Sequence, residues 1–289
     1  MAVQRISTRN ARFQQLQTLL GNRTKRGRAR EFLVQGVRPI TMAVDHGWTI
    51  RSLLYDADRP PSRWAEDLLR RVDAERVAMA PQLLAELSEK ADGAAEVLAV
   101  VGMAPDSLSR IKVHDDFLGL LFDRPTQPGN IGSIVRSADA FGADGLVVTG
   151  HAADPYDPRS VRASTGSFFT VPVVRSPSHH EVMEWLEKER VQGRPVAVVG
   201  TDENGDADVS EFDLTQPVLL LIGNETAGLS AAWRDLCDHV ISIPMTGSAS
   251  SLNASNAASV VLYEARRQRL ARNARVPTVI PAPQTSVPR

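Results

Sequence analysis

Three short segments carry polar side chains at points where a buried strand is expected to give way to a helix. They are residues 129–136, 221–229 and 243–258. Their amide, hydroxyl, guanidinium and carboxylate groups can bind hydroxyl or phosphate oxygens and stabilise negative charge that develops during a reaction. None of the three contains histidine, aspartate or cysteine, so neither a histidine base nor a zinc site is expected there.

The first segment is predicted to open a helix. Gly129 and Asn130 lie at the strand-to-helix turn, and Asn130 is a good N-cap residue. Arg136 follows about two turns later, off the apolar face of the predicted helix. On its own this pattern is more typical of a solvated arginine than of a site.

The other two segments place polar residues among small ones. Glu225 lies between Gly223 and Gly228, and glycine lets a backbone approach a ligand closely or adopt positive φ. The run 251–253, Ser-Leu-Asn, follows a loop of small residues that separates an apolar strand from a periodic helix. An ordinary β-to-α turn and a low-complexity loop are the alternative interpretations of these two segments.

Hydrophobic periodicity predicts the elements that must hold these segments. In the first third of the chain it predicts helices over 8–20, 39–46, 62–72 and 81–89 and strands over 32–34, 50–55, 76–79 and 96–101. Residues 23–30 are almost all basic and are predicted to form a loop. The alternation predicts a small α/β domain over 1–105, followed by a polar linker over 106–116.

The rest of the chain predicts repeated strand-helix units. Strands are expected over 118–122, 146–148, 171–174, 196–199, 218–222 and 240–243, and helices over 131–141, 159–168, 181–192, 229–238 and 253–270. Such repeats predict a doubly wound parallel sheet in a domain over 117–272, with ligands bound after the carboxyl ends of the strands. Residues 273–289 lack periodicity and are predicted to be a disordered tail.

Charge is distributed unevenly although the net charge is only −1. Residues 1–38 carry nine basic residues and one acidic residue, which favours contact with a phosphate backbone over a merely solvated run. The candidate RNA-binding residues are Arg9, Arg12, Arg23, Lys25, Arg26, Arg28 and Arg30. A single cysteine, no signal peptide and no long apolar run predict a cytoplasmic protein.

Several common cofactor motifs are absent. The chain has no Gly-x-Gly-x-Gly after its first strand, no Walker A motif and no dinucleotide fingerprint, which argues against an ordinary Rossmann enzyme such as a dehydrogenase. The six histidines show no metal-ligand spacing, so no metal is expected.

Taken together and in this order, the three segments resemble the motifs of the SpoU (TrmH-type) family of SPOUT RNA 2′-O-methyltransferases. The resemblance covers residues 118–270, and the N-terminal part is similar to the L30e-like domain that often precedes it. Within the family, the chain resembles the avilamycin-resistance 23S rRNA methyltransferases. The resemblance implies a parallel-sheet domain tied in a trefoil knot, S-adenosylmethionine as cofactor, and a homodimer formed through the knot region.

The resemblance also implies the activity. It is methylation of a ribose 2′-hydroxyl, most simply on a uridine of 23S rRNA, with resistance to an avilamycin-type antibiotic as the consequence. A tRNA substrate and a non-catalytic rRNA-binding module are the alternatives.

Site residues follow from the same resemblance. The catalytic set is Arg136, Asn130, Glu225, Ser251 and Asn253, and the cofactor-binding set is Thr201, Gly223, Ile243, Met245 and Leu252. The resemblance gives Arg136 a base-like role. Because a guanidinium hardly deprotonates, we interpret Arg136 as the group that stabilises the incipient alkoxide and a neighbouring phosphate.

Overall fold

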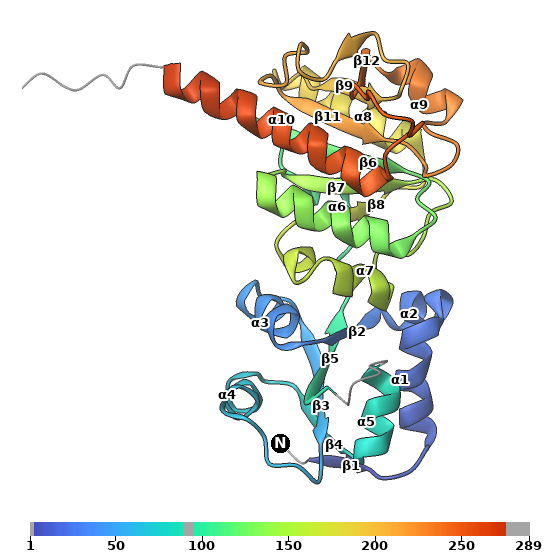
Figure 1. The fold of residues 1–289 in the computed structure, drawn as a ribbon. Coiled ribbons are helices and arrows are strands. Elements are labelled where there is room, and N and C mark those ends of the chain that lie inside the picture. Colours follow the sequence, from blue (N-terminus) through green and yellow to red (C-terminus); the bar gives the residue numbers. More distant parts are fainter. Residues whose placement is uncertain (1–2, 89–94, 276–289) are drawn as a thin grey trace, which may run out of the picture.

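Two β-sheets, one from each half of the chain, lie one above the other in an elongated molecule (Figure 1). The computed structural model describes residues 3–88 and 95–275. No helix in these two stretches is both long and apolar enough to cross a membrane. The predicted helix end at Glu89 and most of the predicted tail, 276–289, lie outside the described residues.

The N-terminal sheet has five strands in the order β1-β4-β3-β5-β2. β1, β4 and β3 are parallel to one another, whereas β5 runs antiparallel to both β3 and β2. The strands are β1 (Gln4–Ile6), β2 (Glu31–Gln35), β3 (Ile50–Asp56), β4 (Glu75–Met79) and β5 (Val97–Gly102). The helices are α1 (Ala11–Gly21), α2 (Arg23–Ala29), α3 (Val37–Asp45), α4 (Arg63–Arg71) and α5 (Pro81–Ser88).

Helix α2 corrects the prediction of a basic loop over 23–30. Asn22 ends α1 and also caps α2, because its side chain accepts a hydrogen bond from the Lys25 N–H. Arg30 closes the helix in the left-handed conformation, with φ of 56°. The high charge of this run concealed an N-cap that was visible in the sequence. Strand β1 was not predicted either.

The C-terminal sheet has seven strands in the order β10-β12-β9-β11-β6-β7-β8, and every neighbouring pair is parallel. This confirms the predicted parallel sheet. The strands are β6 (Leu118–Asp123), β7 (Gly145–Thr149), β8 (Val173–Arg175), β9 (Ala197–Thr201), β10 (Ala207–Asp208), β11 (Val218–Ile222) and β12 (His239–Ser242). The short strand β10 is an addition to the prediction.

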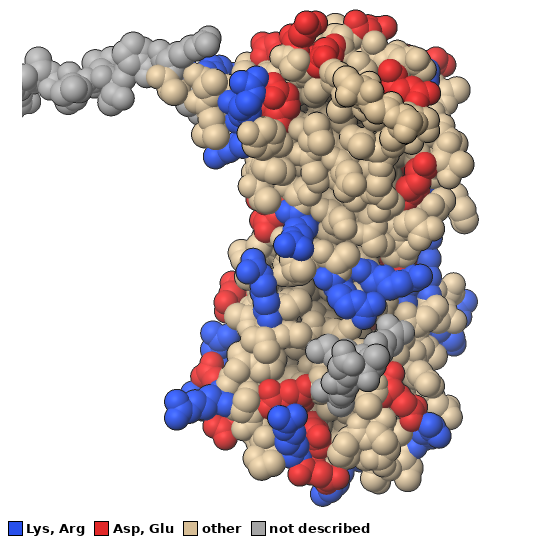
Figure 2. All heavy atoms as spheres, in the orientation of Figure 1, with Lys and Arg blue, Asp and Glu red and all other residues tan. Residues whose placement is uncertain are grey.

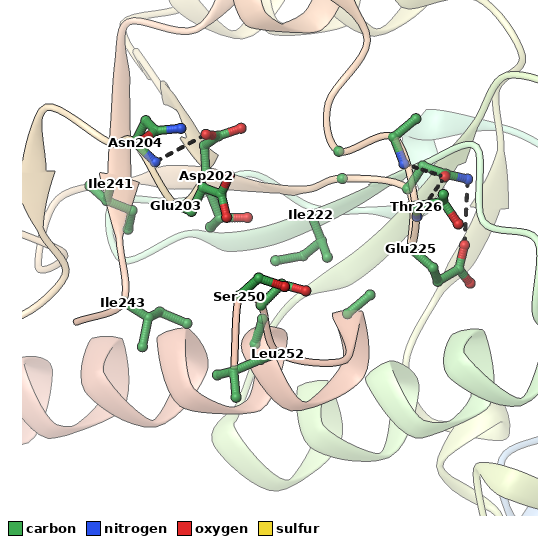
Figure 3. Close-up of a pocket in the computed structure, with 18 of the residues that line it drawn as sticks. Asp202, Glu203, Asn204, Ile222, Glu225, Thr226, Ile241, Ile243, Ser250 and Leu252 are labelled. Carbon is green, nitrogen blue, oxygen red and sulfur yellow. Dashed lines mark hydrogen bonds between the residues drawn. The ribbon is translucent and has the colours of Figure 1, made fainter. Parts of the chain in front are cut away.

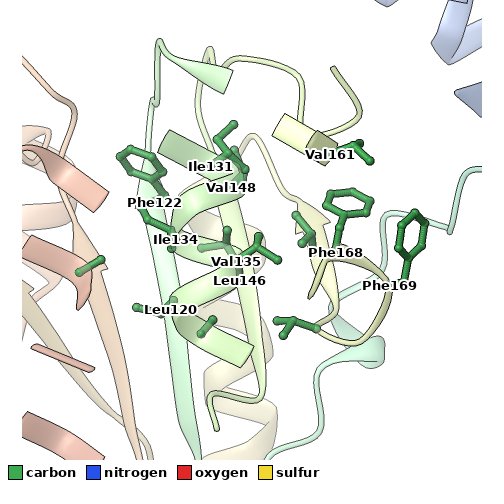
Figure 4. Packing of buried hydrophobic residues seen from close by; sticks show 14 of the residues in the cluster. Leu120, Phe122, Ile131, Ile134, Val135, Leu146, Val148, Val161, Phe168 and Phe169 are labelled. Atoms are coloured by element: carbon green, nitrogen blue, oxygen red, sulfur yellow. The ribbon is translucent and has the colours of Figure 1, made fainter. Parts of the chain in front are cut away.

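Helices cover both faces of this sheet (Figure 1). They are α6 (Pro128–Phe141), α7 (Pro158–Ala163), α8 (His179–Val191), α9 (Ala231–Leu236) and α10 (Ala254–Arg275), with 3-10 turns η1 (Leu108–Arg110) and η2 (Ser167–Phe169). The predicted helix over 159–168 is broken, because Thr165 and Gly166 take positive φ between α7 and η2. On α6, Ile131, Ile134 and Val135 pack onto β6 and β7 (Figure 4).

The two halves share one hydrophobic core. Phe32 of β2 lies 4.9 Å from the ring of Tyr156, and Trp48 lies 5.3 Å from the ring of Phe169, measured between ring centroids. The Trp48 indole N–H also donates to the Phe169 carbonyl. Because these packed rings come from both halves of the chain, the two domains are packed against each other as well as linked by the chain.

Candidate active site

A cavity of about 520 Å³ opens at the carboxyl ends of β9, β11 and β12 (Figure 3). The loop after β9, with Asp202 and Glu203, forms one side, and the loop after β11, with Glu225 and Thr226, forms the other. All five predicted cofactor-binding residues line it: Thr201, Gly223, Ile243, Met245 and Leu252. The wall combines apolar side chains with carboxylates and amides, as small-molecule sites do.

The loop after β11 is a tight turn that glycine makes possible. Asn224 and Gly228 pair with each other across it, and the Asn224 side chain accepts hydrogen bonds from the N–H groups of Thr226 and Ala227. A Cβ atom on Gly223 would lie 2.5 Å from the carbonyl carbon of Gly228. Any larger residue at Gly223 would push the turn apart.

Two carboxylates on the opposite wall differ in their partners. Asp202 accepts a hydrogen bond of 2.6 Å from Arg234. Glu203 is exposed and has no hydrogen bond or ion pair to any described residue. An uncompensated carboxylate at the wall favours a ligand that carries positive charge.

Glu225 connects the loop after β11 to the start of α6. Its carboxylate accepts hydrogen bonds of 3.0 Å from the N–H and the hydroxyl of Thr126, of 3.1 Å from the Gln127 N–H, and of 3.0 Å from the Asn130 amide. Burial raises the pKa of Glu225, but these donors outweigh it and hold the pKa below its ordinary value. A carboxylate held this way stays ionised and is a poor proton acceptor.

Asn130 joins the first and third segments. Its Nδ2 donates to Glu225, and its Oδ1 accepts a hydrogen bond of 3.2 Å from Asn253. Asn253 in turn accepts from the N–H and hydroxyl of Ser255, so it caps the start of α10. The structure therefore brings Asn130, Glu225 and Asn253 into one hydrogen-bonded chain.

Asn130 is not the N-cap of α6, which corrects the prediction. The helix begins at Pro128, and Gln127 is its N-cap. Asn130 lies in the first turn, where its side chain is free to reach Glu225 and Asn253. Proline at the first helical position moved the start of the helix two residues upstream of the predicted cap.

The remaining two predicted catalytic residues, Ser251 and Arg136, are not part of this chain of hydrogen bonds. Ser251 lines the cavity. Arg136 is exposed on α6 and forms no hydrogen bond or ion pair within residues 3–88 and 95–275. Its guanidinium is therefore available to a substrate oxygen or phosphate.

Asp123, the last residue of β6, and Arg124, which follows it, support the site and were not predicted. The Arg124 Nε donates to Asp123 at 3.0 Å, and its Nη2 donates to the Gly228 carbonyl at 3.1 Å. The Arg124 carbonyl accepts a hydrogen bond of 2.6 Å from Asn224. The sequence signal for these two residues was a charged pair at the end of a buried strand. No feature of the sequence predicted the positive φ of Arg124, 49°.

The predicted RNA-binding residues fall into different environments. Arg26 is only 2% exposed and pairs with Asp154, so it cannot contact RNA, which corrects the prediction for this residue. Arg9 and Arg12 are paired with Glu86 and Glu75. The remaining four are exposed: Arg23, Lys25, Arg28 and Arg30.

Two family models match this chain. Residues 10–99 match the SpoU L30e-like domain, and residues 118–263 match the SpoU rRNA Methylase family. A curated relative, the 23S rRNA (uridine(2479)-2′-O)-methyltransferase of Streptomyces viridochromogenes, is 66% identical over 269 residues, 93% of this chain and 94% of its own.

Solved structures agree with these matches. The SpoU methyltransferase AviRb from S. viridochromogenes, in complex with the cofactor AdoMet, gives a TM-score of 0.89 at 67% identity and covers 91% of this chain and 99% of its own. The AdoMet-bound rRNA methyltransferase from Sinorhizobium meliloti gives a TM-score of 0.80 at 28% identity, covering 92% and 98%.

Proposed function

This chain belongs to the SpoU rRNA methylase family, and on that premise we propose that it transfers a methyl group from S-adenosylmethionine to the ribose 2′-hydroxyl of a uridine in 23S rRNA. One observation carries the proposal. The chain of hydrogen bonds from Glu225 through Asn130 to Asn253 joins three separate loops at the rim of a ligand-sized cavity.

The cavity fits the proposed cofactor. Its volume of about 520 Å³ lies within the range of small-molecule sites. We assign the adenosine to Gly223, Ile243 and Leu252, which line the cavity, and the unpaired carboxylate of Glu203 suits a ligand with cationic groups. Thr201 and Met245 complete the proposed cofactor-binding set. When bound, the cofactor supplies an electrophilic methyl group.

The protein's own residues would position the ribose and stabilise charge. Glu225 holds Asn130, and Asn130 and Asn253 together leave a fixed pair of amides at the cavity rim. Arg136 is the cation without a partner on the same helix as Asn130, so we assign it the incipient 2′-alkoxide and an adjacent phosphate. Ser251 supplies a hydroxyl at the cavity wall.

Arg136→Ala tests this assignment. We expect methyl transfer to be abolished while the Kd for S-adenosylmethionine, measured by calorimetry, stays close to that of the unmodified protein, because Arg136 does not line the cavity. Arg63→Ala is the control, since Arg63 is exposed on α4 in the other domain. Substantial methyl transfer by the Arg136 variant would show that the assignment is wrong.

The RNA target is proposed from the relative's name and the basic N-terminal domain, 1–105. Transfer of labelled methyl groups to rRNA and to tRNA, followed by mapping of the modified ribose, separates a 23S uridine from a tRNA target. A 23S target would place the protein in the cytoplasm, and avilamycin-type resistance of cells that express it would follow. We propose no metal in this reaction, and the described residues contain no cluster suited to one.

We also propose a homodimer that forms through the knot region. Its support is a stripe of exposed apolar side chains on α10, where Val260, Tyr263 and Leu270 are 39%, 57% and 52% exposed. Apolar side chains spaced along one helix in this way favour a protein partner. The trefoil knot itself is proposed from family membership, and the small residues of the loop before α10 suit close threading.

A further inference from the structure

Helix α2 is anchored on the catalytic domain by a buried arginine. Arg26 points from α2 into the loop over 151–157, where its Nε donates to Asp154 at 3.0 Å. Its Nη1 donates to the carbonyls of Leu19 and Leu20. Because this guanidinium is satisfied on both sides of the domain junction, it fixes α2 against the catalytic domain.

The same loop contacts the active site. Arg23 donates to the Ala152 carbonyl at 2.6 Å, and the next residue, Ala153, donates its N–H to the Pro125 carbonyl at 2.7 Å. Pro125 precedes Thr126, which binds Glu225. The position of α2 is therefore tied through a few hydrogen bonds to the loop that orients the catalytic amides.

The outer side of this junction is basic. Lys25 and Arg28 on α2, Arg38 on α3 and Arg162 on α7 are all exposed. We call these four the junction surface. None of their side chains has a hydrogen bond or ion pair to a described residue, whereas arginines nearer the N-terminus are paired with acids.

Packing brings α7 against the N-terminal domain and the segment after α7 against α3. Arg162 lines a crevice with Leu20 and Gln35 of the N-terminal domain. The Arg38 Cγ lies 3.6 Å from the Cβ position of Gly166, just after α7. Figure 2 shows Lys and Arg side chains gathered where the two domains meet, whereas Asp and Glu side chains predominate at the upper end and both charges are mixed over the lower part of the molecule.

The junction surface adjoins the catalytic helix. The Cβ position of Gly132 on α6 lies 2.1 Å from the Ser160 carbonyl and 2.8 Å from Ala163, so α6 and α7 are in close contact there. Arg136 lies one turn further along α6 than Gly132, on the same side of the helix. A phosphate backbone that crosses α7 is thereby led toward Arg136.

We propose that the junction surface binds the phosphate backbone of the rRNA. Arg26 is the positioning residue that fixes the part of this surface on α2 relative to the part on α7. The proposal rests on the proposed rRNA substrate. It extends RNA contact to the catalytic domain through Arg162 and excludes Arg9 and Arg12, which are already neutralised.

Salt dependence of rRNA binding tests the surface. In filter binding with a 23S rRNA fragment, log K falls as log salt rises. The variants Arg28→Gln, Arg38→Gln and Arg162→Gln should each reduce the steepness of this fall by about 0.7–0.9, the value for one phosphate contact. Arg5→Gln and Arg9→Gln are matched controls, because both are exposed arginines paired with acids. If all three test variants keep the slope of the unmodified protein, the proposal that the junction surface binds rRNA is wrong.

A second set of variants tests Arg26. Arg26→Met leaves Asp154 with only the longer ion pair to Arg175, 3.8 Å, and Asp154→Leu leaves Arg26 with only the longer ion pair to Asp157, 3.8 Å. Each therefore weakens the compensation of a buried charge, and we expect kcat/KM for rRNA to fall by about 10- to 100-fold in each. The double variant replaces the pair with apolar side chains, so it should be closer to the unmodified protein than either single variant. An unchanged Kd for S-adenosylmethionine in all three would show that the cofactor site is intact.

The outcomes separate this proposal from the proposed function. If the unmodified protein transfers no methyl group to rRNA, the proposed function fails. If it methylates rRNA and all three Arg26 and Asp154 variants do so with unaltered kcat/KM, the positioning role alone is overturned.

Discussion

Glu225→Gln is the sharpest test of how this site is held together. The substitution keeps the size of the side chain and removes its charge. The carboxylate now accepts five hydrogen bonds, from Thr126 N–H, Thr126 hydroxyl, Gln127 N–H and Asn130, and a longer one of 3.5 Å from Asn224. A glutamine amide offers one oxygen, so its NH2 group must face at least one donor.

The structure sets the size of the effect. If the amide oxygen keeps Gln127 and Asn130, the Thr126 hydroxyl can turn to accept, but the Thr126 N–H loses its acceptor. Losing one hydrogen bond to a charged group costs about 1.5–3 kcal/mol. If the loss displaces Asn130 and the transition state is destabilised by the same free energy, kcat drops by roughly 10- to 100-fold, since about 1.4 kcal/mol corresponds to a factor of ten.

Single-turnover methyl transfer at saturating rRNA and cofactor measures this loss directly. Glu66→Gln is the control, because it removes an exposed carboxylate on α4, outside the cavity, without removing a hydrogen bond. The reasoning is refuted if Glu225→Gln keeps its rate within about threefold of the unmodified protein, or if Glu66→Gln loses as much rate.

The pKa of Glu225 adds a pH signature. Its folded pKa lies below the ordinary value, so its stabilising contribution is present above the unfolded pKa, about 4.3, and is lost as pH falls through the folded pKa. Ordering of the Thr126 loop in the unmodified protein should therefore weaken on acidification below about pH 4.3. Glu225→Gln should lack this step, which hydrogen exchange at Thr126 and Gln127 can follow.

Two further substitutions test the packing and assembly. Gly132→Ala places a Cβ 2.1 Å from the Ser160 carbonyl and should lower the free energy of unfolding by about 1–3 kcal/mol in thermal unfolding. Gly129→Ala is the control, because the space around Gly129 is open. Equal Tm values for the two variants would contradict the close contact of α6 and α7. Tyr263→Glu puts a charge on the exposed apolar stripe of α10 and should convert the proposed dimer to a monomer in light scattering. Val191→Glu on α8 is the control and should leave the mass unchanged. A Tyr263 variant that stays dimeric would show that the stripe is not the dimer interface.

Sequence patterns predicted the part of the site that depends on sheet geometry. Parallel strands end at one edge of a sheet, so residues after Ile222 and Ile243 had to lie close together once the strands were recognised. The structure places Gly223 and Leu252 on one cavity accordingly. This inference needs no knowledge of side-chain partners, which is why periodicity sufficed.

Patterns failed where a partner distant in sequence decides the outcome. Arg26 looks like any other residue of a basic run until Asp154, 128 residues away, is placed beside it. Arg162 was passed over because α7 lies outside the basic N-terminal segment. In both cases the decisive quantity is the position of the side chain at the domain junction, buried for Arg26 and exposed for Arg162, which neither charge nor spacing along the chain reports.

The charge state of Glu225 constrains how a ribose proton could leave. A carboxylate whose pKa is lowered by four donors takes up a proton poorly near neutral pH, although it lies next to the proposed substrate site. Arg136 stays protonated and cannot accept one. In the proposed mechanism both groups instead favour the ionised ribose oxygen: Arg136 by its charge, and Glu225 indirectly, by fixing the Asn130 amide that is proposed to bind it. We therefore expect the transfer rate to rise with pH in step with ionisation of the 2′-hydroxyl and to show no Glu225 titration near neutrality, a profile that a carboxylate base would not give.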